Sequence, residues 1–342
     1  FSDTAVLAHP EFDISSLIFS RRAEDFGDLI GFSYDGPVST AYWLDPEMKG
    51  IQDGLNAAFP GKHVALVDYT ADRNRVLFQV SAPNSPPAYY VLVNKSKVAV
   101  IGSQRPWIDE DSLGKGDFVY YTARDGMKIP AIITYPAGYK EGDKAKGAII
   151  VPHGGPWSRD SAGFDSSGWT QFFASRGYII MQPQYRGSAG WGRELWLAGD
   201  GEWGQKMQDD KDDGAAWLVS QGYVDADKIA MHGYSYGGFA AIAASVRPNS
   251  PYQCAIAGAG VGNLAKLANE WGDNRIQRIV QGDTVKGMDP QQNTDKVNIP
   301  ILIYHGDYDV RVPIFHSREF YNAIKDRQPD SEFIVYKQMG HQ

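Results

Sequence analysis

Short apolar stretches alternate with helical stretches through the last two thirds of the 342-residue chain. Apolar strands that alternate with helices predict a mostly parallel, doubly wound β-sheet with helices on both faces. In such sheets, functional sites form in the loops beyond the carboxyl ends of the strands. Five predicted strands run directly into polar or glycine-rich loops, which we therefore expect at one edge of the sheet: "GAIIVPHGGP", "YIIMQPQYRGS", "KIAMHGYSYGG", "IPILIYHGDYD" and "EFIVYKQMGH".

The third of these loops contains the pentapeptide Gly-Tyr-Ser-Tyr-Gly at residues 233–237, between an apolar strand and a helix of small residues. A serine hydroxyl is a weak nucleophile unless it is exposed, close to a base and close to donors for an oxyanion. A G-x-S-x-G turn holds the serine in such a position, and the N-terminus of the helix favours negative charge there. A β-carbon at Gly233 or Gly237 would collide with neighbouring backbone. We therefore predict that Ser235 is a nucleophile.

A serine nucleophile needs a base, and the chain has seven histidines. In α/β-hydrolases the chain order is serine, acid, histidine, with the histidine after the last strand. Only His316 and His341 follow a candidate acid, and only His341 follows a predicted strand, so His341 is the predicted base. The loop "HGDYDVRVP" offers Asp307 and Asp309 as the orienting acid. The local sequence barely separates these two, because the other aspartate could cap the turn through backbone N–H groups.

The oxyanion of an acyl-transfer intermediate needs two preorganised donors. One is the backbone N–H of the residue after the nucleophile, Tyr236. The second is expected from a glycine-rich loop after an early strand. The segment "HGGP" at residues 153–156 fits this description, and the Gly155 N–H is the predicted donor.

Residues 1–115 have a different pattern, with short stretches rich in Val, Tyr and Phe, separated by turn residues and without a helical stretch. Such a pattern predicts an all-β structure. Four consecutive strands have the size of one β-propeller blade, and the segment at 16–46 is expected to form part of another. A small β-sandwich is the alternative interpretation. The four strands are expected at 63–70, 75–82, 88–94 and 97–103, with turns at 71–74, 84–87 and 95–96.

The composition argues against several classes of partner and cofactor. The net charge is −8 and no block of Lys and Arg is present, which argues against a nucleic-acid partner. No apolar run reaches the ~18 residues of a membrane span. The single cysteine, Cys254, allows neither an intramolecular disulfide nor a cysteine zinc site. The aspartates of "QDDKDDGAAWLVSQ" are expected to form a solvated acidic helix face rather than a calcium site. We therefore expect neither a metal nor an organic cofactor.

Seven motifs follow one another between residues 117 and 341: "HGGP", "YRGSAGWG", "GEWG", "DD", "GYSYGG", "HGDYDVRVP" and "GH". With these motifs the chain resembles the prolyl oligopeptidase family of serine peptidases, in the branch that contains acylaminoacyl peptidases and dipeptidyl peptidases. The resemblance implies an α/β-hydrolase domain preceded by an all-β propeller. It also implies peptides as substrates.

The resemblance further implies roles for single residues. Matching the family's motif places the triad acid at Asp309. Arg311 matches a position that holds a backbone carbonyl of the substrate, for which a planar guanidinium is suited. The family's S1 pocket is apolar and aromatic and accepts proline or small apolar residues. Its lining positions fall at or near Tyr236, Val261, Leu264, Trp271 and Val312.

We expect residues 1–115 to form the last two or three blades of a propeller and residues 116–342 to form the catalytic domain. The chain stops one residue after His341, so we expect the domain to lack its final helix. Phe1 is neither an initiator Met nor part of a signal-peptide pattern, so we expect the natural N-terminus upstream. The compartment stays open between cytoplasm and periplasm. Unpaired propeller edges predict that residues 1–342 alone are poorly soluble or inactive compared with a longer natural chain. A homo-oligomer stays open.

The sequence therefore predicts a serine peptidase that hydrolyses short peptides through an acyl-enzyme, with a preference for proline or small apolar residues in S1. Endopeptidase, dipeptidyl peptidase and acylaminoacyl peptidase activities stay open. So do a specialised isopeptidase acting on a constrained peptide, a carboxylesterase on the same fold, and a binding module fused to an inactive hydrolase.

Overall fold

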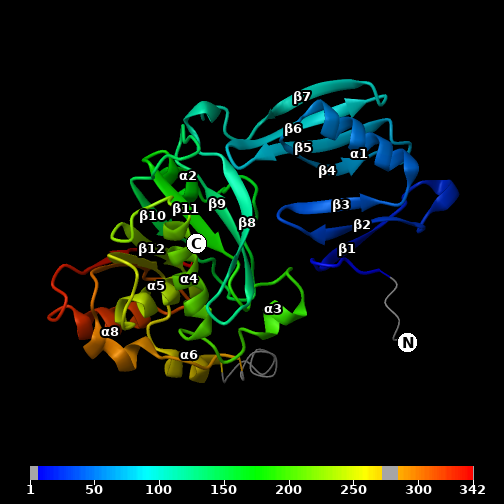
Figure 1. The fold of residues 1–342 in the computed structure, drawn as a ribbon. Coiled ribbons are helices and arrows are strands. Elements are labelled where there is room, and N and C mark those ends of the chain that lie inside the picture. Colours follow the sequence, from blue (N-terminus) through cyan, green and yellow to red (C-terminus); the bar gives the residue numbers. More distant parts are fainter. Residues whose placement is uncertain (1–6, 272–283, 342) are drawn as a thin grey trace.

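The computed structural model describes residues 7–271 and 284–341. Figure 1 shows two parts, which are a pair of antiparallel sheets near the N-terminus and a larger sheet flanked by helices. The first strand of the larger sheet begins at Gly116, where the sequence pattern changes.

In the two N-terminal sheets the strands lie side by side in chain order. A four-stranded antiparallel sheet of this kind is the unit of a propeller blade. The predicted turn at 84–87 is wrong, because β6 already begins at Ser85 and leaves only Pro83 and Asn84 in the turn. The strands are β1 (Ile14–Phe19), β2 (Leu29–Asp35) and β3 (Ser39–Trp43) in one sheet, and β4 (His63–Tyr69), β5 (Arg75–Ala82), β6 (Ser85–Val93) and β7 (Lys97–Ser103) in the other.

The expectation that this part contains no helix is wrong, because α1 (Pro46–Ala58) connects β3 to β4. Asp45 caps the helix by accepting a hydrogen bond from the Met48 N–H at 2.9 Å, and Pro46 occupies the first turn. The cap, the proline and the apolar spacing can all be read from the sequence. The apolar residues lie in one core with side chains of both sheets: Met48, Ile51 and Leu55.

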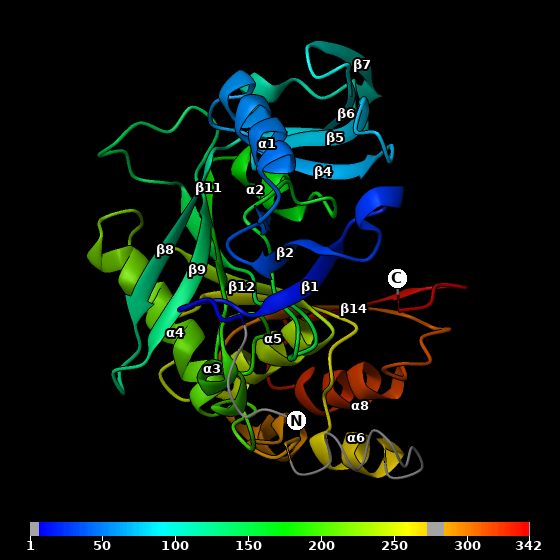
Figure 2. The same cartoon turned by 90° about the vertical axis from the view of Figure 1, so that its right-hand side faces the viewer.

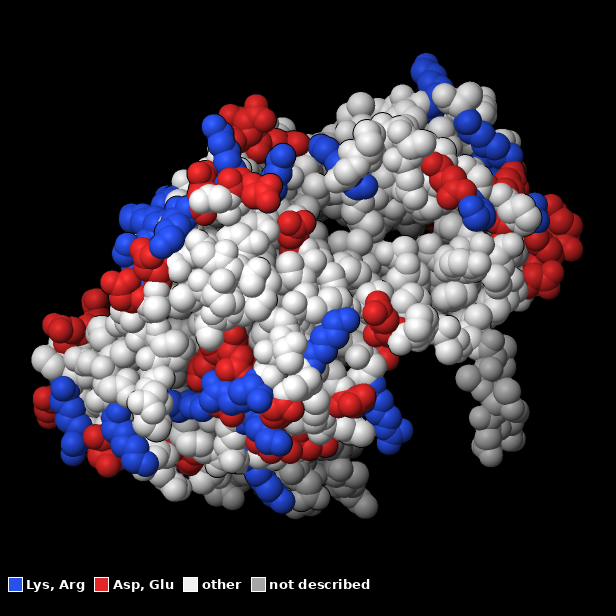
Figure 3. All heavy atoms as spheres, viewed as in Figure 1, with Lys and Arg blue, Asp and Glu red and all other residues white. Residues whose placement is uncertain are grey.

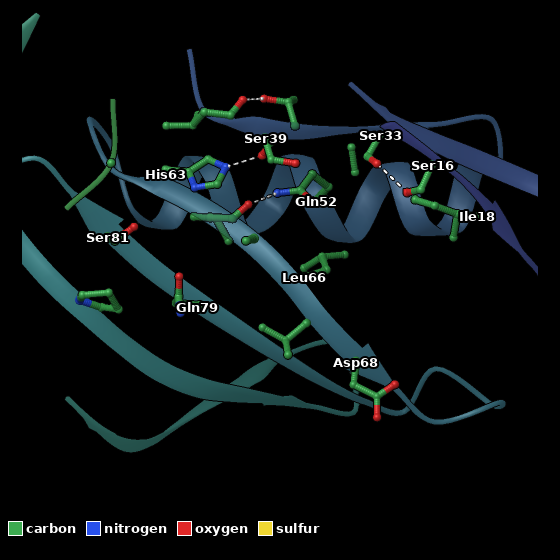
Figure 4. Close-up of a pocket in the computed structure, with 18 of the residues that line it drawn as sticks. Ser16, Ile18, Ser33, Ser39, Gln52, His63, Leu66, Asp68, Gln79 and Ser81 are labelled. Atoms are coloured by element: carbon green, nitrogen blue, oxygen red, sulfur yellow. Dashed lines mark hydrogen bonds between the residues drawn. The ribbon is translucent and has the colours of Figure 1, made fainter. Parts of the chain in front are cut away.

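A cavity of about 890 Å³, with both polar and apolar lining residues, lies between the two N-terminal sheets (Figure 4). His63 of β4 donates a hydrogen bond to the Ser39 carbonyl of β3 at 3.0 Å, and burial lowers the pKa of His63. Ser161, Phe164 and Ser166 of the larger part also line the cavity. The cavity therefore lies where the N-terminal sheets meet a loop of the larger part.

The larger sheet has eight strands in the order β15-β14-β13-β12-β10-β11-β9-β8. Neighbouring strands from β11 through β15 are parallel, whereas β8 and β9 are antiparallel additions at one edge. This arrangement is the mostly parallel sheet that the sequence predicts. The strands are β8 (Gly116–Thr122), β9 (Lys128–Thr134), β10 (Gly147–Ile150), β11 (Tyr178–Pro183), β12 (Ile229–Tyr234), β13 (Cys254–Gly258), β14 (Ile301–Gly306) and β15 (Glu332–Tyr336).

Helices lie on both faces of this sheet. Helix α2 contacts β9 and β11 on one face, and α4 crosses β8, β10 and β11 on the other (Figure 2). Helix α5 contacts β12 and β13 and is buried along its whole length. The helices are α2 (Trp169–Ala174), α3 (Arg193–Leu197), α4 (Lys206–Ser220), α5 (Tyr236–Val246), α6 (Leu264–Trp271) and α8 (Phe315–Ile324), with a 3₁₀ segment at Pro290–Lys296.

The face of the sheet that carries α2 is only partly covered within the described part of the chain. An apolar groove of about 1000 Å³ lies beside α2 and extends over β13, β14 and β15. Parallel sheets are normally covered on both faces. Over β13, β14 and β15, this face of the sheet lines an open groove instead. Aromatic side chains make up much of the lining: Trp169, Phe172, Phe173, Tyr304 and Tyr336.

The acidic residues of α4 do not form the solvated face that the sequence predicts. Asp210 is fully buried, and its carboxylate accepts two hydrogen bonds from the Arg186 guanidinium, at 2.7 and 2.9 Å. Asp213 pairs with Arg124 at 2.7 Å. The prediction failed because the arginines come from distant loops, so the sequence of the helix alone does not show that its carboxylates face them.

Acidic and basic side chains are mixed over the face of the molecule that Figure 3 shows. Exposed ion pairs such as that between Lys144 and Asp225, at 2.5 Å, join side chains of opposite charge. Among the described residues, no helix combines the length and the hydropathy needed to cross a membrane.

The buried ion pair predicts a large loss of stability when one partner is removed. Asp210→Ala leaves the Arg186 guanidinium buried with Asp125 as its one remaining carboxylate partner among the described residues, so the free energy of unfolding should fall by about 3–5 kcal/mol. Denaturant unfolding measures this change. The control, Asp225→Ala, removes an exposed carboxylate from Lys144 and should leave the stability almost unchanged. Equal effects of the two substitutions would show that the Asp210 pair has no special role.

Candidate active site

Ser235 lies in a tight turn between β12 and α5, with a φ of +59° and a ψ of −118°. A positive φ is costly for a residue with a β-carbon and persists only where the surroundings enforce it. The Ser235 N–H donates to the Gly258 carbonyl at 2.9 Å. A β-carbon at Gly233 would lie 2.2 Å from the Gly237 carbonyl oxygen, and one at Gly237 would lie 2.2 Å from that of Pro152. Both glycines are needed because backbone passes this close to them.

A chain of hydrogen bonds joins the three residues predicted to form a triad. His341 Nε2 lies 3.0 Å from Ser235 Oγ, and His341 Nδ1 lies 2.6 Å from Asp309 Oδ2. Because an ionised carboxylate can only accept, Nδ1 carries the proton, and Nε2 is free to accept the serine proton. Ser235 follows β12, Asp309 follows β14 and His341 follows β15. The three side chains therefore meet at one edge of the sheet.

The Asp309 carboxylate is fully buried and held by several donors. Its Oδ1 accepts hydrogen bonds from the backbone N–H groups of Arg311 and Val312, each at 2.9 Å. Its Oδ2 lies 2.6 Å from His341 Nδ1 and 3.2 Å from His305 Nε2. These contacts fix the orientation of the carboxylate and hold its Oδ2 against His341.

Asp307, the alternative acid, lies in a different environment. Its Oδ1 accepts a hydrogen bond from the Gln338 N–H at 2.6 Å, and the Tyr308 N–H donates to the Met339 carbonyl at 2.9 Å. Asp307 therefore holds the loop after β15 against the loop after β14. The turn after β14 is capped by Asp309, which also bonds to His341, so the expectation that the other aspartate caps this turn is wrong.

His305 supports the loop that carries Asp309, a role that the local sequence does not reveal. The His305 Nε2–H donates to the Val312 carbonyl at 2.7 Å, and the Ser317 hydroxyl donates to His305 Nδ1 at 2.7 Å. Burial lowers the pKa of His305, which favours the neutral ring that these bonds require. The sequence around His305 does not show this hydrogen bond, because its partner Ser317 lies in α8, a separate element.

The glycine-rich loop after β10 passes directly beside the serine. A β-carbon built on Gly154 would lie 3.5 Å from the Ser235 β-carbon. Gly155 has a φ of +113°, a conformation that favours glycine. On the other side of the serine, Tyr236 is the first residue of α5, where an N–H has no carbonyl partner within the helix. The two predicted oxyanion donors thus belong to backbone segments that adjoin Ser235.

Four of the five residues predicted to line S1 lie in one buried apolar cluster. The cluster begins at the nucleophile turn with Tyr236 and extends to Trp203, Met207 and Phe239. The side chain of Trp271, the fifth predicted residue, lies outside the described residues. The predicted residues in the cluster are Tyr236, Val261, Leu264 and Val312.

Comparison with protein families gives a match to the family described as "Prolyl oligopeptidase family" over residues 164–342. The chain belongs to the prolyl oligopeptidase family. Among curated proteins, dipeptidyl aminopeptidase BIII of Pseudoxanthomonas mexicana is 28% identical over 319 residues, covering 87% of this chain and 46% of that protein. Dipeptidyl peptidase family member 6 of Caenorhabditis elegans is 28% identical over 316 residues, covering 82% of this chain and 42% of that protein.

Solved structures of similar proteins share the fold. A Pyrococcus horikoshii acylaminoacyl peptidase has a TM-score of 0.74 and 19% identity, covering 97% of this chain and 52% of that one. A puromycin-hydrolyzing peptidase of Mycobacterium tuberculosis has a TM-score of 0.73 and 20% identity, covering 95% and 51%. These likenesses confirm the predicted fold class, an α/β hydrolase preceded by part of an all-β propeller. The chain spans about half the length of the family members it matches.

The different contacts of the two aspartates predict different effects on the serine. Asp309→Asn removes the acceptor that fixes the His341 tautomer, so the reaction of Ser235 with a fluorophosphonate probe should slow by up to about 10⁴-fold. Asp307→Asn changes only a backbone cap and should slow it far less. The labelling rate of each purified variant measures both effects. Equal slowing by the two substitutions would contradict the assignment of the acid.

Proposed function

We propose that this protein is a serine peptidase that hydrolyses short peptides through an acyl-enzyme intermediate. The observation that carries the proposal is the continuous hydrogen-bonded chain from Ser235 Oγ through His341 to Asp309 Oδ2, at 3.0 and 2.6 Å. The positive φ of Ser235 adds support, because backbone strain of this kind concentrates at catalytic sites. Membership of the prolyl oligopeptidase family supports the same reaction class.

In the first half of the reaction, Ser235 Oγ attacks the carbonyl carbon of the scissile bond while His341 Nε2 takes its proton. The negative charge that develops on the substrate oxygen is accepted by the N–H groups of Gly155 and Tyr236. The C–N bond then breaks, and His341 gives its proton to the leaving amine. Asp309 stays ionised throughout and stabilises the imidazolium. The product of this half is an ester of Ser235.

In the second half, His341 takes a proton from water as the water oxygen attacks the ester carbonyl. The same two N–H groups hold the second oxyanion. When the C–O bond to Ser235 breaks, His341 returns the proton to Oγ, and the carboxylic acid product leaves. Every proton is carried by groups of this chain or by water, so the proposed reaction uses no metal and no organic cofactor.

The proposed S1 subsite prefers proline or small apolar residues. Its support is the buried apolar cluster that starts at Tyr236 and includes Val261, Leu264 and Val312. A site of this kind binds a compact apolar side chain by removing its surface from water. We assign the same subsite to substrates with either a free or a blocked amino terminus.

We also propose that Arg311 holds a carbonyl group on the acyl side of the scissile bond. Its backbone N–H bonds to Asp309 at 2.9 Å, which ties it to the triad. Its side chain is exposed and has no partner among residues 7–271 and 284–341. A planar guanidinium with unused donors suits the recognition of a carbonyl oxygen.

The proposal is tested on the natural full-length protein with a fluorophosphonate probe and a peptide library. Labelling of Ser235, together with its loss in Ser235→Ala, is expected, and an unlabelled Ser235 would support the alternative of a binding module with an inactive hydrolase. Peptides with free and with blocked amino termini then separate dipeptidyl, acylaminoacyl and endopeptidase activities. Cleavage of esters but of no linear peptide would favour a carboxylesterase, and cleavage only of side-chain-linked or constrained peptides would favour an isopeptidase.

Arg311→Ala separates peptide from ester hydrolysis. A peptide has a carbonyl beyond the S1 residue, whereas a small nitrophenyl ester has none. Loss of the charge-assisted hydrogen bond, worth about 1.5–3 kcal/mol, should lower kcat/KM on peptides by roughly 10- to 100-fold and leave the ester rate almost unchanged. Steady-state kinetics on both substrates measure this difference.

The matched control for Arg311 is Arg318→Ala, which removes an exposed arginine from α8. It should change neither activity, whereas Ser235→Ala should abolish both. If Arg311→Ala slows peptide and ester equally, Arg311 is structural and the proposed subsite is wrong.

A further inference from the structure

The motif "YRGSAGWG" at residues 185–192 lies against the glycine-rich loop at 153–156 and its continuation. The Tyr185 hydroxyl donates to the His153 carbonyl at 2.7 Å, and His153 Nε2 lies 2.8 Å from the Ser188 hydroxyl. The Ala189 N–H donates to the Ser158 carbonyl at 2.9 Å. Burial lowers the pKa of His153 to about 3, so its ring stays neutral. The motif therefore holds the proposed oxyanion loop from one side.

Arg159 connects the continuation of this loop to the N-terminal sheets. Its guanidinium donates from Nη1 to the Asp35 carbonyl at 2.5 Å and from Nη2 to the Gly36 carbonyl. Both carbonyls belong to the hairpin between β2 and β3. Three residues further on, the Ala162 N–H donates to the Pro37 carbonyl of the same hairpin at 2.7 Å.

The guanidinium is enclosed by residues of the same motif. It lies 4.3 Å from the centre of the Trp191 ring, in a stacked arrangement. A β-carbon on Gly190 would lie 2.3 Å from Arg159 Nη1, so the site of the guanidinium requires glycine there. The Gly190 N–H in turn donates to the Asp13 carboxylate at 3.1 Å, and the Asp13 N–H donates to the Gly190 carbonyl at 3.1 Å. Arg159 is thus held between the motif and the N-terminal sheets.

Only a short, bonded turn separates Arg159 from the proposed oxyanion donor. The Ser158 N–H donates to the Pro156 carbonyl at 2.8 Å, and Pro156 follows Gly155 directly. The Asp160 N–H donates to the Gln184 side chain at 2.9 Å, which fixes the residue after Arg159. Because the turn between Arg159 and Gly155 spans only three residues and carries its own hydrogen bond, we expect a displacement of Arg159 to shift Gly155.

We propose that Arg159 is a positioning residue, which sets the Gly155 N–H in the oxyanion hole by tying its loop to the β2–β3 hairpin of the N-terminal sheets. This inference rests on the proposed function. It makes the N-terminal part a structural partner in the acyl transfer, because the second oxyanion donor is in place only while the hairpin is docked. The two parallel donors of a guanidinium reach two carbonyls at once, which a lysine ammonium does not reproduce.

The experiment compares Arg159→Ala with Arg105→Ala in the natural full-length protein. Arg105 also joins the two parts, donating to the Ser166 carbonyl at 2.7 Å, but it does so ten residues beyond Pro156 and outside the bonded turn. Loss of a well-placed oxyanion donor lowers kcat rather than substrate binding. Arg159→Ala should therefore lower kcat on peptides by roughly 10- to 100-fold with KM nearly unchanged. Arg105→Ala should leave both nearly unchanged.

A peptide aldehyde inhibitor provides a readout that a merely structural role would not change. Its carbonyl carbon bonds to Ser235 Oγ, its oxygen takes up the negative charge of the adduct, and that oxygen occupies the oxyanion hole. The affinity for the aldehyde should fall in Arg159→Ala by the same factor as kcat, whereas the affinity for the corresponding peptide alcohol, which forms no adduct, should not change. Equal losses for aldehyde and alcohol, or an effect on KM alone, would overturn the proposal.

Gly190→Ala is the second variant, for use if Arg159→Ala does not fold. Its β-carbon displaces the guanidinium from the opposite side, so it should give the same loss of kcat and of aldehyde affinity. A folded Gly190→Ala protein with wild-type kcat would overturn the role of Arg159. Failure of the proposed function is recognised separately, because in that case the wild-type protein itself would hydrolyse no peptide and leave Ser235 unlabelled.

Discussion

The conformation of Ser235, with a φ of +59° between β12 and α5, is the constraint on which the rest of the site depends. A side chain in this region is strained, so the surroundings must hold it there. Bare backbone on three sides does so, because Gly233, Gly237 and Gly238 allow neighbouring segments to approach closer than any β-carbon permits. The helix that follows is fully buried. The turn therefore cannot relax without disturbing the core, and the serine hydroxyl is held at the edge of the sheet.

Loops that bond to one another, rather than to the sheet, complete this arrangement. Asp307 joins the loop after β14 to the loop after β15, and Asp309 then meets His341 across the same junction. On the other side of the serine, Tyr185 holds the glycine-rich loop through the His153 carbonyl. The Asp309 and Tyr185 contacts satisfy buried polar groups, and an unsatisfied one would cost about 1–3 kcal/mol. The same bonds that stabilise the loops therefore also fix the distances among Ser235, Asp309 and His341.

Prediction from the sequence succeeded where a pattern is local and failed where partners are distant. The glycines beside Ser235 and the strand before it are adjacent in sequence, so the turn could be predicted with its reason. Helix α1 was missed although its cap at Asp45 is a local signal. The buried state of Asp210 had no local signal, because its partner Arg186 lies on another element. The contacts of Arg159 also had no local signal, because its carbonyl partners lie more than a hundred positions away in the chain.

The sequence by itself determined the type of sheet, the tight turn at Ser235 and the chain order of the three proposed triad residues. Strand period and the glycine requirement are properties of neighbouring residues, and chain order is read directly from the sequence. The local sequence left Asp307 and Asp309 open, and the family resemblance placed the acid at Asp309. The tertiary structure shows the physical difference between them, because Asp309 is buried and bonds to His341, whereas Asp307 bonds to the Gln338 N–H. It also decided that the N-terminal hairpin touches the loop of the proposed oxyanion hole. Such contacts depend on how separate elements pack. Packing brings together residues that are far apart in the chain, and their spacing in the sequence does not predict the contact.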